Sequence, residues 1–181
     1  MAVATDGNST NGLLGAPLTF LAVAATAGFL CATPATAQSL TFAAGSTAEG
    51  DAVFRLGYVH PWPGSYLERW GFERLVEVTV ANWQTGPGDN SVQLITLAPV
   101  WHRPIWGDLG LEVMIGLGFF SDQQVGKHDM GSQGHFQTGF GFSYPVGPGY
   151  LTADVRHYSN AGLAKPNPGI EVYTIGYYYR F

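Results

Sequence analysis

From residue 38 onward, apolar and polar residues alternate in short runs separated by clusters of glycine, proline, asparagine and aspartate. A period of two predicts β-strands, because successive side chains of a strand point to opposite faces of the sheet. The clusters "GPGDN" at 86–90, "PVGPG" at 145–149 and "KPNPG" at 165–169 predict turns, since these residue types adopt the backbone angles that end strands. We expect eight strands, at 40–47, 52–60, 71–84, 91–102, 109–120, 134–144, 149–159 and 170–181.

Each predicted strand has one face rich in large apolar residues and one face with smaller or polar residues. The apolar face of 109–120 consists of Leu109, Leu111, Val113, Ile115, Leu117 and Phe119. Its other face consists of Gly110, Glu112, Met114, Gly116, Gly118 and Phe120. A soluble β-sandwich alternates in the same way, but glycines and charged residues on one face suit the narrow interior of a small barrel.

Composition favours a membrane protein over a soluble one. Hydrophobic residues make up 46% of the chain and aromatic residues 14%, whereas charged residues make up only 12%. A soluble domain usually carries about 25% charged residues. From Gln38 onward, however, no run of about 20 apolar residues could form a spanning helix. We therefore predict an all-β fold, an eight-stranded antiparallel transmembrane β-barrel.

Side chains at particular positions fit this barrel. Outer-membrane barrels carry girdles of aromatic residues at both membrane interfaces. We expect five residues in these girdles: Trp62, Trp83, Trp101, Trp106 and Tyr144. We also expect an internal network of charged residues: Glu77, Glu112, Asp154, Arg156 and Arg180.

The start of the chain has the features of an export signal. An apolar, alanine-rich stretch at 18–32 is followed by Pro34 and by Ala-Thr-Ala at 35–37, which fits a cleavage site. The segment is atypical because the first basic residue of the chain is Arg55. We expect a signal peptide at 1–37 and the barrel domain at 38–181. Cys31 is the one cysteine of the chain, so the exported part would have no thiol for a disulfide or a metal.

These features predict a location in the outer membrane of a Gram-negative bacterium. With the N-terminus in the periplasm, the connections 84–90, 121–133 and 160–169 would face the outside, whereas 61–70 is long for a periplasmic turn. The formal net charge of -5 gives no basic surface for nucleic acid. The oligomeric state stays open, with a homodimer among the alternatives.

The last predicted hairpin places polar groups on its lipid-facing side. Leu151, Ala153, Val155, His157 and Ser159 share one face of 149–159, opposite Thr152, Asp154, Arg156 and Tyr158. By the same alternation, Glu171 joins the outward set of 170–181. Polar and ionisable groups on a lipid face cost free energy, and they usually have a task.

These three groups could form a hydrolytic unit. His157 and Ser159 are two residues apart on one face, at a Cα separation of roughly 6–7 Å, and Glu171 lies on the adjacent strand. In such a unit the serine is the nucleophile, the histidine is the base and the acid orients the histidine. Asn160 and the backbone N–H groups of Ala161 or Gly162 are the nearest oxyanion donors. In the structural alternative, the same residues are turn formers and an interfacial carboxylate.

The string "HYSNAGLAKPNPGIE" at 157–171 resembles the signature of the outer-membrane lipid A 3-O-deacylases, the PagL family. The resemblance is strongest across 156–173 and extends more loosely to "RLGY", "LAPVWHR" and "GLGFFS". It implies an eight-stranded barrel with its active site near the outer leaflet. It also implies that His157 is the base, Ser159 the nucleophile, Glu171 the orienting acid and Asn160 an oxyanion donor.

The implied reaction is serine-type hydrolysis of the ester at the 3-position of lipid A, with release of a 3-hydroxy fatty acid. Lipid A is then the substrate, and the reaction scheme requires no metal or organic cofactor. Two alternatives remain: an outer-membrane phospholipase with the same three residues, and a non-catalytic barrel that stabilises the membrane or binds lipopolysaccharide. We expect structural or solvated roles for the other histidines, His60, His102, His128 and His135.

Overall fold

The computed structural model describes residues 38–62, 67–85 and 91–181. The expected signal peptide at 1–37 lies outside these residues, so it stays a prediction. Nowhere in the described part does the chain form a helix long and apolar enough to cross a membrane.

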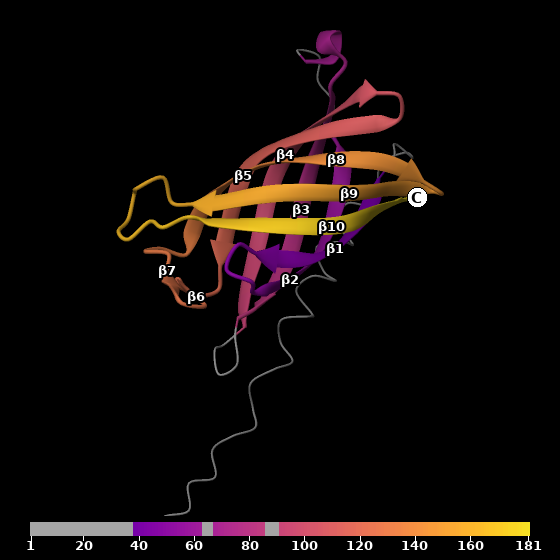
Figure 1. Ribbon diagram of the computed structural model, residues 1–181. Coiled ribbons are helices and arrows are strands. Elements are labelled where there is room, and N and C mark those ends of the chain that lie inside the picture. Colours follow the sequence, from indigo (N-terminus) through magenta and orange to yellow (C-terminus); the bar gives the residue numbers. More distant parts are fainter. Residues whose placement is uncertain (1–37, 63–66, 86–90) are drawn as a thin grey trace, which may run out of the picture. The chain divides into compact units, whose positions relative to one another are not determined.

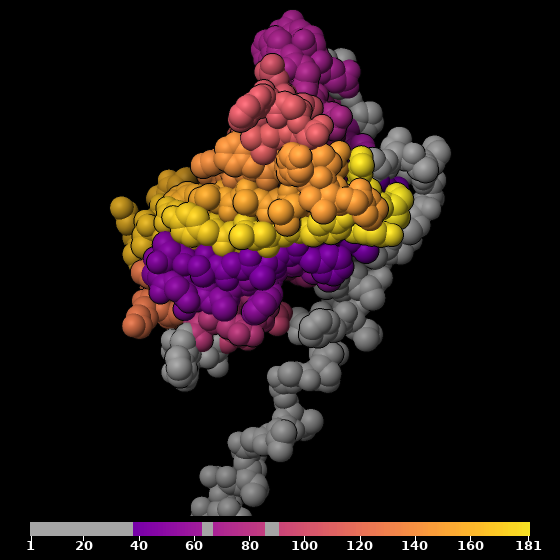
Figure 2. Space-filling view, turned by 45° about the vertical axis from the view of Figure 1, so that its right-hand side comes forward, coloured from indigo at the N-terminus to yellow at the C-terminus, as the bar shows by residue number. Residues whose placement is uncertain are grey.

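Eight long strands form a closed antiparallel barrel (Figure 1), as the alternation predicted. They are β1 Ser39–Thr47, β2 Ala52–Pro61, β3 Glu73–Gln84, β4 Val92–Trp106, β5 Leu109–Phe120, β8 Gly134–Val146, β9 Gly149–Ser159 and β10 Ile170–Arg180. Each strand pairs with the next one along the chain, and β1 pairs with β10 to close the barrel. Figure 2 shows this closure, with the indigo β1 directly beside the yellow β10.

Three features lie outside the eight predicted strands. The strands β6 Gln124–Val125 and β7 His128–Asp129 form a short hairpin between β5 and β8, and the 3-10 helix η1 Glu68–Trp70 lies between β2 and β3. β4 also extends beyond residue 102, because Arg103 and Pro104 continue the pairing with β5, through a register shift before Trp106. We call the end that carries 121–133 and 160–169 the loop end, and the other the opposite end.

The faces of the strands follow the predicted alternation. Ile95, Leu117 and Ile175 point outward and are more than half exposed, whereas Met114 and Phe120 are fully buried inside. An apolar outer surface around a filled interior is the arrangement of a membrane barrel.

One aromatic prediction was wrong. Trp83 is not part of an outer girdle: it is 1% exposed and lies inside the barrel. The alternation of side chains along β3 is the reason. Trp83 is an even number of residues from Glu77, so both side chains point into the barrel. Its indole packs edge-on against the rings of Phe120 and Tyr158, at centroid distances of 5.1 and 5.7 Å. Trp62, Trp106 and Tyr144 are exposed, as interfacial residues must be.

The middle of the barrel holds a buried network of four charged side chains. Arg156 Nη1 donates to Glu77 Oε2 at 2.7 Å, and Arg156 Nε donates to Asp154 Oδ1 at 3.0 Å. Arg55 Nη2 donates to Asp154 Oδ2 at 2.6 Å. Pairing and hydrogen bonding offset the cost of burying these charges. The sequence pattern did not predict that Arg55 belongs to this network.

Two members of the predicted network lie elsewhere. Arg180 is exposed, and its guanidinium lies 4.7 Å from the centroid of the Tyr150 ring instead of within the network. Glu112 is buried and accepts a hydrogen bond from the Tyr178 hydroxyl at 3.3 Å.

Toward the loop end, the interior is apolar. The buried cluster there comprises Val53, Ala81, Trp83, Val92, Leu94, Phe120, Val125, Met130, Tyr158, Ile170 and Val172. Val125 and Met130 come from the 121–133 connection and are fully buried. This connection therefore folds inward and fills the barrel at the loop end.

Candidate active site

His157 and Glu171 face each other on neighbouring strands. They are direct partners in the β9–β10 register, and His157 Nδ1 lies 2.9 Å from Glu171 Oε1. Both side chains are partly exposed, at 41% and 45%, on the outward face. A neutral ring that donates its Nδ1–H to the carboxylate carries its lone pair on Nε2, the nitrogen that could accept a proton.

Ser159 lies two residues further along β9, at the end of the strand and on the same outward face. The burial of 156–160 alternates strictly: Arg156, Tyr158 and Asn160 are buried, whereas His157 and Ser159 are partly exposed. On its other side, Ser159 is the register partner of Phe136 in β8. The structure thus brings the serine, the histidine and the glutamate to one patch of the barrel wall.

Gly169 also contacts the histidine, which the sequence did not indicate. It has a φ of +69°, and a Cβ built there would lie 2.6 Å from His157 Cε1 and 3.3 Å from Nε2. The absence of a side chain at Gly169 therefore makes room for the imidazole. The sequence pattern had suggested only a turn at this position.

Asn160 ties the 160–169 loop together. It is 2% exposed, and its Oδ1 accepts the backbone N–H of Gly162 at 2.9 Å. Its own backbone N–H donates to Asn167 Oδ1 at 2.9 Å, and its Nδ2 donates to the carbonyl of Met130 at 3.0 Å. The hydrogen bonds of Asn160 therefore hold the 160–169 loop in place. The backbone N–H of Gly162 already has an acceptor within this loop, Asn160 Oδ1. The prediction that Asn160 and Gly162 are oxyanion donors stays a prediction.

The 160–169 loop also packs against the loop that fills the barrel. Gly131 has a φ of +72°, and a Cβ there would collide with the carbonyl oxygen of Pro166. The backbone N–H of Gly131 donates to Asp129 Oδ1 at 2.8 Å, which fixes this turn. The 160–169 loop, which follows Ser159, therefore packs against a second, partly buried loop at 121–133.

Around the polar patch the surface is apolar. Phe136 and Tyr173 are close to half exposed on the same wall, and Leu163 at the loop end is almost fully exposed. Among the described residues, no three His, Cys, Asp or Glu side chains are placed to hold a metal ion. The arrangement offers a base, an acid that orients it and a hydroxyl, on a surface suited to a lipid.

Comparisons with known proteins point to one family. The family model described as lipid A 3-O-deacylase (PagL) matches residues 52–180. A protein of Pseudomonas aeruginosa named lipid A deacylase PagL is 31% identical over 165 residues, which cover 87% of this chain and 94% of the relative.

Solved structures agree with this match. The crystal structure of the outer membrane enzyme PagL superposes with a TM-score of 0.72 at 27% identity, and the match covers 79% of this chain and 99% of the other. A de novo designed transmembrane β-barrel matches with a TM-score of 0.54 at 14% identity, over 82% of this chain and 98% of the other. This second likeness concerns the fold alone.

Proposed function

Because the chain belongs to the lipid A 3-O-deacylase (PagL) family, we propose that it is an outer-membrane hydrolase that cleaves the ester at the 3-position of lipid A. The products are a 3-hydroxy fatty acid and a lipid A that lacks this chain. The observation that carries the proposal is the 2.9 Å contact between His157 Nδ1 and Glu171 Oε1, on the same outward face as Ser159.

In the proposed mechanism, Ser159 Oγ attacks the ester carbonyl while His157 Nε2 takes its proton. The carboxylate of Glu171 stabilises the imidazolium that forms. The tetrahedral intermediate collapses to an acyl-serine, and the histidine returns the proton to the departing sugar hydroxyl. Water then attacks the acyl-serine, again with His157 as the base, and the fatty acid leaves.

Asn160 and Gly162 are the proposed oxyanion donors, because they lie one and three residues after the nucleophile. The N–H of Gly162 now donates to Asn160 Oδ1. Stabilisation of the oxyanion would require this N–H to turn toward the substrate oxygen. The Asn160 side chain would therefore set the starting orientation of this donor.

The location of the site suits a substrate that is itself a membrane lipid. The interior of the barrel is filled at the loop end, and the proposed reactive groups lie on the outer wall near that end. A periplasmic N-terminus places the loop end in the outer leaflet, where lipid A resides. Lipid A could then reach Ser159 by lateral diffusion, without passing through the barrel.

The test is mass spectrometry of lipid A from a Gram-negative host that expresses the protein, compared with a Ser159→Ala variant. We expect the wild type to remove one 3-hydroxyacyl group and Ser159→Ala to lower the rate by about 10³-fold or more. Ser91→Ala, at an exposed position just before β4, is the matched control and should keep full activity.

Folding of each variant is checked by its migration on gels with and without heating. Unchanged lipid A in the presence of a folded wild-type barrel would refute the deacylase proposal. Release of fatty acid from phospholipids with intact lipid A would instead identify a phospholipase. If neither lipid changes, the non-catalytic barrel is favoured.

A further inference from the structure

The basic residues of the chain are distributed unevenly along the barrel. Of the eight, Arg55 and Arg156 are buried inside, and Lys127 and Lys165 lie in connections of the loop end. The remaining four are all at the opposite end: Arg69, Arg74, Arg103 and Arg180. In the orientation proposed above, these arginines lie at the level of the periplasmic leaflet.

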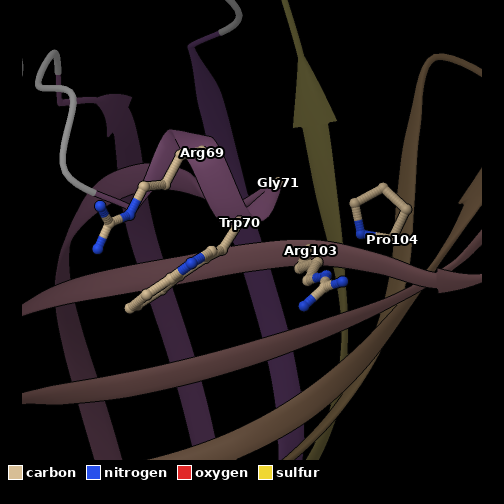
Figure 3. A pocket seen from close by; sticks show the side chains of 5 residues that line it. All are labelled: Arg69, Trp70, Gly71, Arg103 and Pro104. Carbon is tan, nitrogen blue, oxygen red and sulfur yellow. The ribbon is translucent and has the colours of Figure 1, made fainter.

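Two of these arginines line a common pocket on the protein surface. The pocket is formed by Arg69 and Trp70 of η1, by the following Gly71, and by Arg103 and Pro104 of β4 (Figure 3). η1 lies beside the extended end of β4, as Figures 1 and 2 both show. The unpredicted extension of β4 therefore builds one wall of this pocket.

Aromatic rings, rather than carboxylates, hold the two guanidinium groups. The Arg69 guanidinium lies 4.7 Å from the centroid of the Trp70 ring, and that of Arg103 lies 5.5 Å from the centroid of the Phe72 ring. In the described part of the chain, neither arginine forms an ion pair. Cation–π contacts leave the N–H groups of a guanidinium available to an anion.

No acidic residue among those the structure describes lines the pocket. Glu68 precedes Arg69 but does not line the pocket, and Glu73 lies 3.6 Å from His102 Nδ1. Two cationic residues therefore line the pocket without an acidic one from the described part of the chain, and Figure 3 shows the Trp70 ring between their guanidinium groups. The chemistry that fits is a phosphate, which arginine binds through paired N–H groups.

The surrounding surface indicates that this phosphate belongs to a lipid. Trp70 lines the pocket and is exposed, and Trp62, Ile105 and Trp106 are exposed at the same end of the barrel, with Trp106 84% exposed. Tryptophan prefers the headgroup level of a bilayer, where its ring is apolar and its N–H stays polar. A patch that combines such indoles with arginines matches an anionic headgroup and the upper part of its acyl chains.

We propose that the pocket formed by Arg69, Trp70, Gly71, Arg103 and Pro104 binds the phosphate of an anionic phospholipid in the periplasmic leaflet. The Arg103 guanidinium contacts the phosphate oxygens, the Arg69 guanidinium adds positive charge on the other side of the Trp70 ring, and the neighbouring indoles lie against the glycerol and acyl region. This inference rests on the proposed orientation in the membrane, but it does not depend on the deacylase reaction. It gives the barrel a lipid site at the end opposite to Ser159.

The test uses the full-length protein as exported, in bilayer nanodiscs of equal phosphatidylglycerol and phosphatidylcholine. Native mass spectrometry then gives the ratio of the two lipids retained on the protein. We expect phosphatidylglycerol to be enriched on the wild type. Arg69→Gln combined with Arg103→Gln should lower the enrichment at least about fivefold, the factor that one arginine near an anionic lipid contributes.

Two further variants control for charge and folding. Lys127→Gln combined with Lys165→Gln removes the same charge at the loop end and should leave the enrichment unchanged. Arg69→Lys combined with Arg103→Lys keeps the charge and should retain part of the enrichment. Each variant is first shown to be folded by heat-modifiable migration.

Three results would overturn the proposal. These are equal retention of the two lipids by the wild type, full enrichment in the double glutamine variant, and an equal loss in the double lysine-to-glutamine variant. Removal of the enrichment by millimolar inorganic phosphate, but not by chloride at the same ionic strength, would assign the pocket to free phosphate instead. Lipid A deacylation is measured on the same samples, so failure of the deacylase proposal is seen separately.

Discussion

At the level of single residues, the imidazole of His157 is held from two sides. Glu171 accepts a hydrogen bond from Nδ1, and the backbone of Gly169 lies against the edge that carries Cε1 and Nε2. The carboxylate thus fixes the tautomer, whereas the glycine leaves the space in which the ring lies. The proposed role of His157 as a base toward Ser159 would depend on both contacts, because small misplacements of a reacting group lower rates strongly.

Gly169→Ala tests this packing. The added Cβ would lie 2.6 Å from His157 Cε1, so the ring must move. We expect the deacylation rate to fall by roughly 10- to 100-fold. The rate is measured on lipid A in mixed micelles, with unfolding in urea as the measure of stability.

Gly107→Ala separates this effect from backbone strain. Gly107 also has a positive φ, +55°, but a Cβ there meets nothing within 4 Å. Both variants should lose about 1 kcal/mol of stability from the left-handed backbone, and only Gly169→Ala should lose activity. Equal activity in the two variants would show that Gly169 is merely a turn residue.

At the level of elements, the candidate site is next to two loops, 121–133 and 160–169, that contact each other. Asn160 Nδ2 donates to the carbonyl of Met130, whose side chain fills the end of the barrel. The β9–β10 connection is thereby joined to the segment that carries β6 and β7. A change in one loop should therefore affect the order of the other.

Asn160→Asp tests this coupling, because it keeps an acceptor for Gly162 but removes the Nδ2 donor. We expect faster cleavage by trypsin after Lys127, which lies between β6 and β7. Loss of a buried hydrogen bond of this kind costs about 1–3 kcal/mol. Cleavage after Lys165 does not complicate the measurement, because trypsin does not cleave before the proline that follows it. An unchanged cleavage rate would show that the two loops are ordered independently.

The sequence predicted the barrel and the outward positions of His157, Ser159 and Glu171, because both depend on period-two alternation. The same alternation places Trp83 on the inward face of β3, so its expected place in an outer girdle conflicted with the strand pattern. The β6–β7 hairpin and the end of β4 were missed for a different reason. Pro104 resembles a turn residue, and the contact between Asn160 and Met130 joins positions too far apart for any local pattern.

At the level of the whole molecule, the charged network in the middle of the barrel connects strands that are distant in sequence. Arg156 of β9 reaches Glu77 of β3, and Arg55 of β2 reaches Asp154 of β9. These pairs cross the lumen and link opposite walls. His157 directly follows Arg156, so the network also anchors the strand that carries the site.

Arg156→Met tests the contribution of this network to stability. Removal of one partner leaves the carboxylate of Glu77 buried without its cation, which should cost about 3–5 kcal/mol. The free energy of unfolding is measured by urea titration in lipid vesicles. Arg156→Met combined with Glu77→Gln should recover a large part of the loss. No recovery in this double variant would contradict an electrostatic origin of the cost.

The pairing of β9 with β10 sets the moment at which the proposed site is complete. Glu171 and His157 are direct partners in the register of these two strands, and β10 is the C-terminal strand of the barrel in the described part of the chain. In the proposed mechanism, His157 therefore acquires its carboxylate only when the β9–β10 hairpin has formed. A chain in the periplasm without this hairpin would be inactive, and lipid A cleavage would report that the hairpin has folded.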